Sequence, residues 1–322
     1  MGDSRESKSR GGTQRGVALA RIMELSHVMS LRKLSPVLLV LTTSCLIQPD
    51  QPALVDFRVD ALTQYNHRGM VQNDTGVLQG DMNVNLAVKG EGELDIRAWA
   101  NMDLDSDTGD AWFPDGHGGE VTEAQYSATY TKSFDEASLS VGIFNYSVLN
   151  GSEFQQNTAM LADDRGPTTE VFARLGYDLT QAFFDQVPVT VTPAFIFHYD
   201  IDEVEDLYAE GNLRFGAVLS QVLGWFSAED QAEWTENLSF GIEGNIGYSG
   251  DDHSLWAYGF AEEGFSDWRV SGDVSYAITD ETTLRAMVSY GQIINSDLRD
   301  WFDIIDIDNE NVWGGLGITW SF

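Results

Sequence analysis

The residues of this chain that could bind a metal ion are concentrated in one acidic run. Residues 103–110 read DLDSDTGD, with carboxylates on Asp103, Asp105, Asp107 and Asp110. Carboxylate oxygens at alternate positions can converge on a hard cation such as Ca²⁺. The run departs from the EF-hand pattern, because its glycine comes one place late and Pro114 stands where that pattern has a glutamate. We therefore expect a weak surface Ca²⁺ site or a solvated loop, and no other cofactor.

Four histidines are the candidate general bases of a hydrolase: His67, His117, His198 and His253. A hydrolase also needs an activated nucleophile, and no serine stands in a recognisable nucleophile motif such as Gly-x-Ser-x-Gly. We expect His198 to lie in the lumen or at the rim of a barrel. The sequence favours a protein that is not an enzyme, with an outer-membrane hydrolase as an alternative.

Further charged residues alternate with apolar residues along the chain. This set is Asp56, Arg58, Asp60, Asp81, Asp95, Arg97, Glu170, Arg174, Glu210, Arg214, Glu243, Arg269, Asp273 and Arg285. Charged groups tolerate an enclosed position only when they are paired or hydrated. If they line a water-filled lumen, we expect a mildly cation-selective pore; if they pair across the lumen, we expect no measurable conductance.

The last stretch of the chain shows the element that would hold these residues. Residues 311–322 read NVWGGLGITWSF, and every second residue back from Phe322 is apolar or glycine. Period-two alternation is typical of a β-strand with one apolar face. The stretch resembles the C-terminal strand of bacterial outer-membrane barrels, which ends in an aromatic residue. In such a barrel the last strand pairs with the first, because an open sheet edge in hydrocarbon would leave unpaired backbone groups.

The same alternation marks 13 segments, whereas single-chain bacterial barrels have an even number of strands. Either residues 254–260 are not a full strand, or another strand lies within 147–167 or 219–236. We predict an all-β fold: a single antiparallel up-and-down transmembrane barrel of 12 strands, with 14 as the alternative. A soluble secreted β-sandwich remains the competing fold.

Aromatic residues recur near the predicted strand ends, as the interfacial girdles of a membrane barrel require. They are Tyr65, Tyr130, Tyr146, Tyr177, Tyr199, Tyr248, Trp268, Tyr276, Tyr290 and Trp320. The connections are of two sizes. Residues 89–92, 251–253 and 279–281 are predicted to be turns, whereas 103–121, 147–167 and 291–310 are long and acidic and are expected outside the cell. Residues 221–236 could form a short amphipathic helix.

Charge excludes some partners. The chain carries a net charge of -33, and from Leu46 onward it has 11 basic and 48 acidic residues. Such a surface repels nucleic acid and anionic membranes. No apolar run reaches the roughly 20 residues of a transmembrane helix. The oligomeric state is not predictable from these features.

The N-terminal region predicts export. Residues 1–28 are polar and aperiodic, which is typical of disorder or of an upstream extension. Residues 29–45 have a basic start, an apolar centre (LSPVLLVL) and small residues before Cys45, the pattern of a secretory signal peptide. Cys45 is either a lipidation site or lies near an ordinary cleavage site. The predicted barrel occupies residues 54–322.

A motif in the first predicted hairpin resembles a known family. Residues 65–72 read YNHRGMVQ, followed by Leu78-Gln79-Gly80. This resembles the Tyr-x-x-Arg-Gly-x-x-Gln stretch of the Gcw-type conserved hypothetical proteins of the bacterial envelope. The resemblance implies an outer-membrane barrel without an agreed activity. On physical grounds, Gly69 permits a tight bend, and Arg68 could turn inward toward acids of the lumen.

These observations predict a protein of the bacterial outer membrane. We expect a porin-like channel for small polar solutes or a structural envelope protein. The expected partners are outer-membrane lipid and the barrel-assembly machinery, which would recognise the strand that ends at Phe322.

Overall fold

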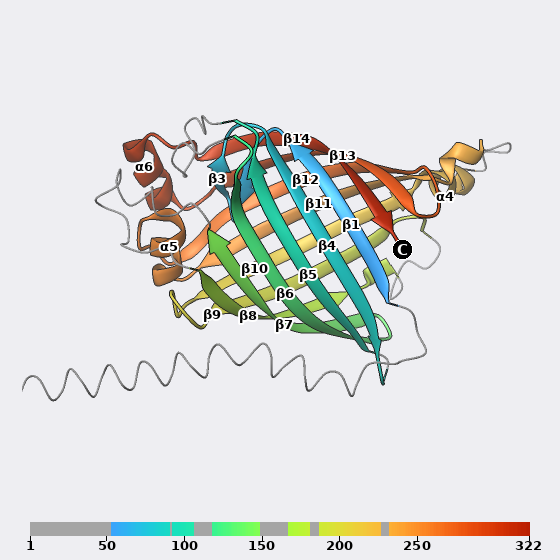
Figure 1. Ribbon diagram of the computed structural model, residues 1–322, viewed down its shortest axis with the longest axis horizontal. Helices are drawn as coiled ribbons and strands as arrows, with labels where there is room; N and C mark the ends of the chain where they lie inside the picture. The colour runs from blue at the N-terminus through green and yellow to red at the C-terminus, as the bar shows by residue number, and fades with distance from the viewer. Residues whose placement is uncertain (1–52, 91, 106–117, 149–166, 181–186, 227–231) are drawn as a thin grey trace, which may run out of the picture. The chain divides into compact units, whose positions relative to one another are not determined.

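Twelve antiparallel strands close into one β-barrel. The computed structural model describes residues 53–90, 92–105, 118–148, 167–180, 187–226 and 232–322. The barrel strands are β1 (Leu54–Leu62), β4 (Val77–Val88), β5 (Gly92–Asp103), β6 (Val121–Phe134), β7 (Ala137–Val148), β8 (Thr168–Tyr177), β9 (Thr190–Asp200), β10 (Leu207–Val218), β11 (Leu238–Ser249), β12 (Gly264–Ala277), β13 (Thr282–Ile293) and β14 (Glu310–Ser321). They follow one another around the ring, as Figure 1 shows. The predicted all-β barrel of 12 strands, rather than 14, is confirmed.

The last strand closes the ring onto the first, as its sequence predicts. β1 and β14 pair antiparallel from Asp56↔Ser321 to Leu62↔Gly315. The rings of Phe57 and Trp320 stack across this seam, with their centroids 5.8 Å apart. Closure leaves neither strand with an unpaired edge.

Alternation along each strand separates two faces. The outward face carries exposed apolar side chains on every side of the ring: Val141, Phe195, Phe197, Ile242, Val270, Val274, Leu284, Val288 and Leu316. The inward face carries the charged set predicted from sequence, because residues one position away point to the opposite side of a strand. The barrel is therefore apolar outside and polar inside.

The two ends of the barrel differ. One end, called the terminus end, has short turns at 89–90, 135–136 and 278–281, and the first and last barrel strands begin and end there. Where a single short helix over residues 221–236 was predicted, this end has α4 (Leu219–Trp225), which begins and ends earlier, and the 3₁₀ turn η1 (Glu233–Thr235).

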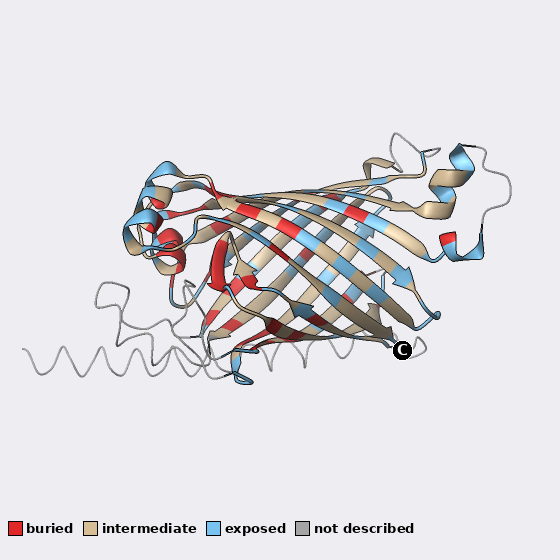
Figure 2. Ribbon diagram, turned by 90° about the horizontal axis from the view of Figure 1, so that it is seen from above, coloured by how far each residue is buried: buried red, intermediate tan, exposed pale blue. Residues whose placement is uncertain are grey.

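The opposite end, called the plug end, carries a small second sheet and two helices. The sheet consists of β2 (Tyr65–His67) and β3 (Met70–Asn73), and the helices are α5 (Asp251–Tyr258) and α6 (Ser296–Ile305). All three long connections predicted from sequence leave the barrel at this end. Most buried residues lie here too, as Figure 2 shows.

Helix α5 corrects one prediction and decides between two alternatives. Residues 251–253 are not a turn but the start of α5. Residues 254–258 continue this helix, so the alternative in which residues 254–260 are not a full strand is confirmed. Asp251 and Asp252 favour the helix because acidic side chains in the first turn interact well with the helix dipole. Gly259 ends it with a φ of 75°, the left-handed conformation that glycine adopts at helix C-termini.

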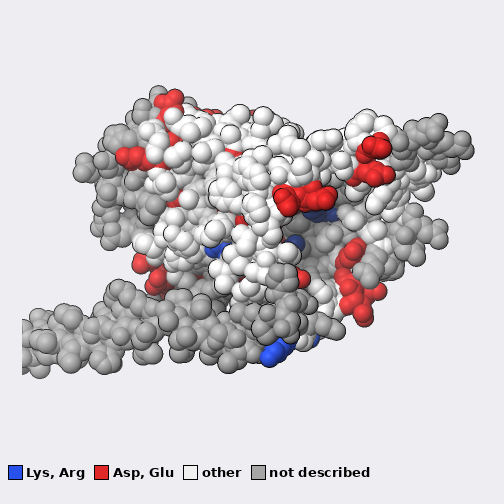
Figure 3. Space-filling model, turned by 45° about the vertical axis from the view of Figure 1, so that its right-hand side comes forward, with Lys and Arg blue, Asp and Glu red and all other residues white. Residues whose placement is uncertain are grey.

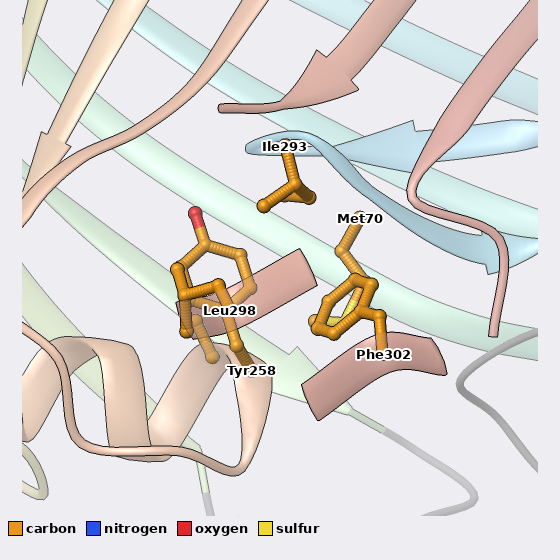
Figure 4. Packing of buried hydrophobic residues seen from close by; sticks show 6 residues of the cluster. Met70, Tyr258, Ile293, Leu298 and Phe302 are labelled. Carbon is orange, nitrogen blue, oxygen red and sulfur yellow. The ribbon is translucent and has the colours of Figure 1, made fainter. Parts of the chain in front are cut away.

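An apolar cluster joins the helices to the small sheet. Met70 of β3 packs with Tyr258 of α5, Leu298 and Phe302 of α6, and Ile293 at the end of β13, as Figure 4 shows. Helix α6 is fixed in place at its start, where the Asn295 side chain accepts hydrogen bonds from the backbone N–H groups of residues 297 and 298. No helix in the described part of the chain has the length and hydropathy to cross a membrane.

Candidate functional site

A polar hairpin enters the lumen between the first two barrel strands. We call residues 65–73, which form β2 and β3, the hairpin plug. Strands β1 and β4 pair with each other up to Leu62↔Val77, so the plug leaves the wall beyond that pair, at the plug end. A ring of twelve strands has a backbone diameter of roughly 24 Å at the usual strand spacing and tilt, which is wide enough to hold a hairpin.

The plug contacts strands on all sides of the ring. Tyr65 packs on Trp99 of β5, with ring centroids 5.6 Å apart. His67 lies 5.6 Å, between ring centroids, from Tyr146 of β7. Arg68 reaches β8 and β10, as described below, and Gly69 lies against β12 and β13. Because these strands surround the lumen, the plug spans its cross-section.

Arg68 at the tip of the plug forms the central ion pair. Its guanidinium donates two hydrogen bonds to the Glu170 carboxylate, at 2.7 and 2.6 Å, and its Cζ lies 4.3 Å from the centre of the Tyr208 ring. The two side chains of the pair are only 7% and 4% exposed. Burial alone would lower the pKa of Arg68, but the charge of Glu170 outweighs burial and leaves that pKa raised. The tip therefore stays charged and paired.

His253 of α5 completes the contacts of Arg68. Its Nε2 lies 2.7 Å from Arg68 Nη1, and its Nδ1 lies 2.8 Å from Ser249 Oγ. A guanidinium only donates, so Nε2 accepts and the proton sits on Nδ1, an assignment made from the hydrogen-bond network. Ser249 and His253 resemble a nucleophile and base, but they are 0% and 1% exposed. The pair thus offers no access to a substrate.

The backbone of the tip is held as firmly as its side chain. The Tyr258 hydroxyl donates to the Arg68 carbonyl at 2.8 Å. Burial and the charge of Asp267 raise the pKa of Tyr258 well above its usual value, so this hydroxyl remains a donor. Gly69 has a φ of 79°, and a Cβ there would lie 2.4 Å from the Asp267 Cβ. Only glycine fits this tip without displacing it.

A second polar contact fixes the base of the plug. Glu123 of β6 accepts hydrogen bonds from Tyr65 and Tyr146 through their hydroxyls, at 3.1 Å each, and from Gln125. Tyr65 and Tyr146 are buried. Both were predicted to be girdle residues, and that prediction is wrong, because each phenol points inward to a carboxylate instead of toward lipid.

A small polar cavity lies beneath the tip. It has a volume of about 20 Å³ and is lined by Asn66, Arg68, Glu210, Asn245, Asp267 and Arg269, among others. That volume suits one or two water molecules. Glu210, a predicted lumen residue, accepts a hydrogen bond of 2.6 Å from Asn245 at this cavity.

Toward the terminus end, charged side chains form two ladders on the wall. The first joins Arg58 to Asp60 and Asp81, at 2.9 and 2.8 Å, and Arg97 to Asp81 at 2.7 Å. These residues belong to β1, β4 and β5, which are neighbours. Arg97 is 39% exposed, although it faces the interior. The lumen next to this ladder is therefore open to water.

The second ladder lies across the ring on β10 to β13. Its ion pairs are Arg214–Glu243 at 3.2 Å, Arg214–Asp273 at 3.1 Å, Arg269–Glu243 at 4.0 Å and Arg285–Asp273 at 3.4 Å. In each ladder the paired residues belong to strands that lie close together in the ring. The ion pairs of the two ladders therefore do not cross the lumen and fill it, which was one of the two alternatives considered from sequence.

The other predicted site residues fall in separate places. Asp56, Asp95 and Arg174 share the inward faces of β1, β5 and β8 and form no salt bridge within the described residues. Asp103 accepts hydrogen bonds from Asn101 and Thr122, at 3.1 and 3.3 Å. Asp107 and Asp110 lie outside the described residues, and no group of three metal-binding side chains occurs within them. The Ca²⁺ site remains a prediction.

His198 lies on β9 at the lumen, as the sequence predicts, with Nδ1 2.9 Å from Glu170 Oε2. His67 sits on the plug itself. Sequence reasoning missed that His198 and His253 lie near the ion pair of Arg68, because they come from parts of the chain far from the plug, His253 185 residues after Arg68. The one available signal was the inward turn expected of Arg68, which the structure shows.

Comparisons with known proteins concern the fold alone. No known protein family and no curated protein sequence matches the chain, so the resemblance to the Gcw-type proteins is not confirmed. The barrel is similar to the NanC porin, with a TM-score of 0.43, 9% identity, and coverage of 83% of this chain and 98% of that one.

Two further solved barrels are similar. One is the KdgM porin in complex with a disordered oligogalacturonate, with a TM-score of 0.39, 8% identity, and coverage of 84% of this chain and 99% of that one. The other is the outer-membrane channel DcaP of Acinetobacter baumannii, with a TM-score of 0.38, 9% identity, and coverage of 84% and 96%. At these scores the likeness carries no argument about what this chain does.

Proposed function

We propose that this protein is an outer-membrane barrel whose lumen is a passage for small polar solutes, and that the hairpin plug closes this passage. The observation that carries the proposal is the contrast within one lumen. A hairpin fills the cross-section at the plug end, whereas the wall toward the terminus end carries hydrated charged side chains. A closed passage accounts for both.

The orientation of the two faces supports a membrane location. A soluble barrel or sandwich buries its apolar face and exposes its polar one. Here Val288, Leu316 and Ile242 are exposed on the outside, and the charged ladders lie inside. An apolar outer surface around the whole ring suits lipid, since soluble monomers rarely expose so large an apolar patch.

Charge on the molecule is distributed in keeping with this location. On the face shown in Figure 3, most described atoms belong to uncharged residues, and acidic side chains gather in separate patches. Seven of the 11 basic residues that follow Leu46 line the lumen or the plug: Arg58, Arg68, Arg97, Arg174, Arg214, Arg269 and Arg285. Acids outnumber these arginines on the inner wall, so we expect the opened passage to prefer cations mildly.

A structural envelope role is the second candidate. The buried Arg68–Glu170 pair and the apolar cluster around Met70 favour it, because both hold the plug in place. We propose no catalytic role, since the Ser249–His253 pair is enclosed. The terminal Phe322 is exposed, which suits recognition by the barrel-assembly machinery.

The test exploits the direct pairing of Leu62 with Val77. Residues 63–76 are replaced by a two-residue Asn-Gly turn, which connects antiparallel strands without changing their register. We expect the variant to form channels in planar bilayers, whereas the full chain stays closed at neutral pH. A matched control replaces residues 279–280 in the turn at the terminus end by Asn-Gly and leaves the plug intact, so it should remain closed.

The outcomes separate the candidates. Heat-modifiable migration on a gel first shows that each variant folds. A folded plug-less barrel that conducts nothing would overturn the passage and favour the structural role. Equal conductance of the full chain and the plug-less variant would show that the plug closes nothing.

A further inference from the structure

The hydrogen bond between Arg68 and His253 holds only while His253 is neutral. Arg68 Nη1 and His253 Nε2 are 2.7 Å apart, and the guanidinium has no lone pair to offer. A proton on Nε2 would remove the acceptor and place a second cation against Arg68 in a site with almost no water. The contact that fixes the tip of the plug would become a repulsive one.

We propose that the hairpin plug is released by acid: protonation of His253 and His67, next to Arg68, expels the tip and opens the lumen. This inference rests on the proposed passage, because it assigns the condition under which that passage opens. His253 contacts the Arg68 guanidinium from α5, and His67 precedes Arg68 on the plug itself. His198 of β9 contacts Glu170, the partner of Arg68.

His67 adds a second titrating group next to the tip. Burial and the charge of Arg68 hold the pKa of His67 at about 3, and the same two causes keep the pKa of His253 well below its usual value. Both rings are therefore neutral in the closed barrel at neutral pH. Outside the pocket, each would regain an ordinary histidine pKa, so acid favours the released plug.

His198 acts on the partner of Arg68. Its Nδ1 lies 2.9 Å from Glu170 Oε2, the same oxygen that accepts from Arg68 Nη2 at 2.6 Å. The His198 ring and the Arg68 guanidinium therefore share one carboxylate oxygen, so the ion pair that anchors the tip has a competitor beside it.

Other charged and titratable groups face this pocket from every packed element. They are Tyr65 on β2, Glu123 on β6, Tyr146 on β7, Glu170 on β8, Tyr208 and Glu210 on β10, Asp206 before β10, Tyr258 on α5, and Asp267 and Arg269 on β12. Glu210 and Asp267 already accept hydrogen bonds from Asn245 and from Ser266 and Tyr208. Asp206 accepts from the backbone N–H of His253.

The plug has the composition of a segment that can leave its pocket. Beside Arg68 and His67 it carries Asn66, Gln72 and Asn73, and Gln64 precedes it. Gln64, Asn66 and Gln72 each have a buried side-chain nitrogen or oxygen that forms no hydrogen bond with any described residue. Such groups are better satisfied in water than in the pocket. Release therefore restores hydrogen bonds that the closed state lacks.

The expected effect follows from linkage. A histidine that is neutral in the closed state and has an ordinary pKa in the open state shifts the balance toward opening up to tenfold per pH unit below about 6.5. Between pH 7.5 and 5.0, one such histidine raises the open-to-closed ratio about 30-fold. The direction of the pH dependence is fixed: the open state binds more protons than the closed state, so the open-to-closed ratio increases as pH falls.

The experiment measures planar-bilayer conductance of the full chain at pH 7.5 and 5.0. We expect the open probability to rise at least about 30-fold at pH 5.0. The variant His253→Gln should lose most of this rise, because an amide can accept from Arg68 but does not titrate. The control His117→Gln, in the connection between β5 and β6, should respond as the unchanged chain does.

Hydrogen exchange of residues 64–75, corrected for the intrinsic pH dependence, gives a readout independent of conduction. The expected result is faster exchange of these residues at pH 5.0 in the full chain and a much smaller acceleration in His253→Gln, where only His67 still titrates. If the plug-less barrel conducts and neither conductance nor exchange of the full chain responds to pH, acid release is overturned and the passage stands. If the plug-less barrel never conducts, the proposed function itself fails.

Discussion

The two halves of the lumen contain the same kind of ion pair in different surroundings, one buried and one hydrated. At the plug end, Arg68 and Glu170 are 7% and 4% exposed, whereas Arg97 and Asp81 on the ladder wall are 39% and 12% exposed. A dry pair is strongly destabilised when one partner is lost, because the other charge remains buried. A hydrated pair contributes little, since water takes over from the missing partner. Burial, rather than the pairing itself, decides which pair fixes a segment.

Arg68→Met should have the largest effect. The change leaves Glu170 buried without its cation and should lower the free energy of unfolding by about 3 to 5 kcal/mol. Urea unfolding of the barrel in lipid vesicles measures this. The matched double variant Arg68→Met/Glu170→Gln should recover much of the loss, because no unpaired charge remains. A double variant as unstable as the single one would show that packing of the tip, and not its charge, holds the plug.

The comparison assumes that the charged face points inward, and a pair of adjacent substitutions tests this. Val288→Arg places a charge on the outer face, where the side chain is 55% exposed, and should cost about 2 to 4 kcal/mol near the midplane of the bilayer. Met287→Arg, one residue away on the inner face, should cost much less. Folding into vesicles, read by heat-modifiable gel migration, compares the two. An equal loss of folding in both variants would contradict the assignment of the outer and inner faces.

Gly69→Ala sharpens the contrast at the tip of the plug. A Cβ there would meet the Asp267 Cβ at 2.4 Å on a backbone with φ of 79°, so we expect a loss of about 1 to 3 kcal/mol in the docking of the plug. Gly244→Ala is the control, because a Cβ there meets nothing within 4 Å. Hydrogen exchange of residues 64–75 should accelerate in the first variant alone. Unchanged exchange would mean that the tip tolerates displacement.

Arg97→Met should have the smallest effect, on the hydrated ladder. The side chain is partly exposed to the lumen water, and Asp81 keeps Arg58 as a partner at 2.8 Å. We expect a change within about 1 kcal/mol in the free energy of unfolding. In the plug-less barrel, the reversal potential should move toward stronger cation preference. A loss as large as that of Arg68→Met would show that the ladder is as dry as the plug.

The sequence allowed the barrel to be predicted because each strand repeats one local rule. Alternation of apolar and polar residues defines both faces, and the final strand shows it down to Trp320 and Phe322. The same rule misled at residues 254–260, where aromatic residues two apart imitate a strand, although Asp251, Asp252 and Gly259 carry the signals of a helix. Local signals outweighed periodicity there.

The site could be predicted only in part. The tight bend at Gly69 and the inward turn of Arg68 follow from residue type, and both are present. Their partners do not, because Glu170 and His253 lie 102 and 185 residues further along the chain. Strand number and register decide which inward positions meet a hairpin from the other side of the ring. No pattern within the plug encodes those distances.

The long separation between the plug and its partners also sets an order of assembly. The hairpin belongs to the first strands of the barrel, but its tip is held by Glu170, His253 and Tyr258, which come 102, 185 and 190 residues later. Contacts this far apart in sequence form only after the intervening chain has been arranged, because closing such loops is costly in entropy. Strands β1 and β4 meanwhile pair without the hairpin, up to Leu62↔Val77. The barrel wall can therefore be completed around an empty lumen, and we expect the plug to enter last.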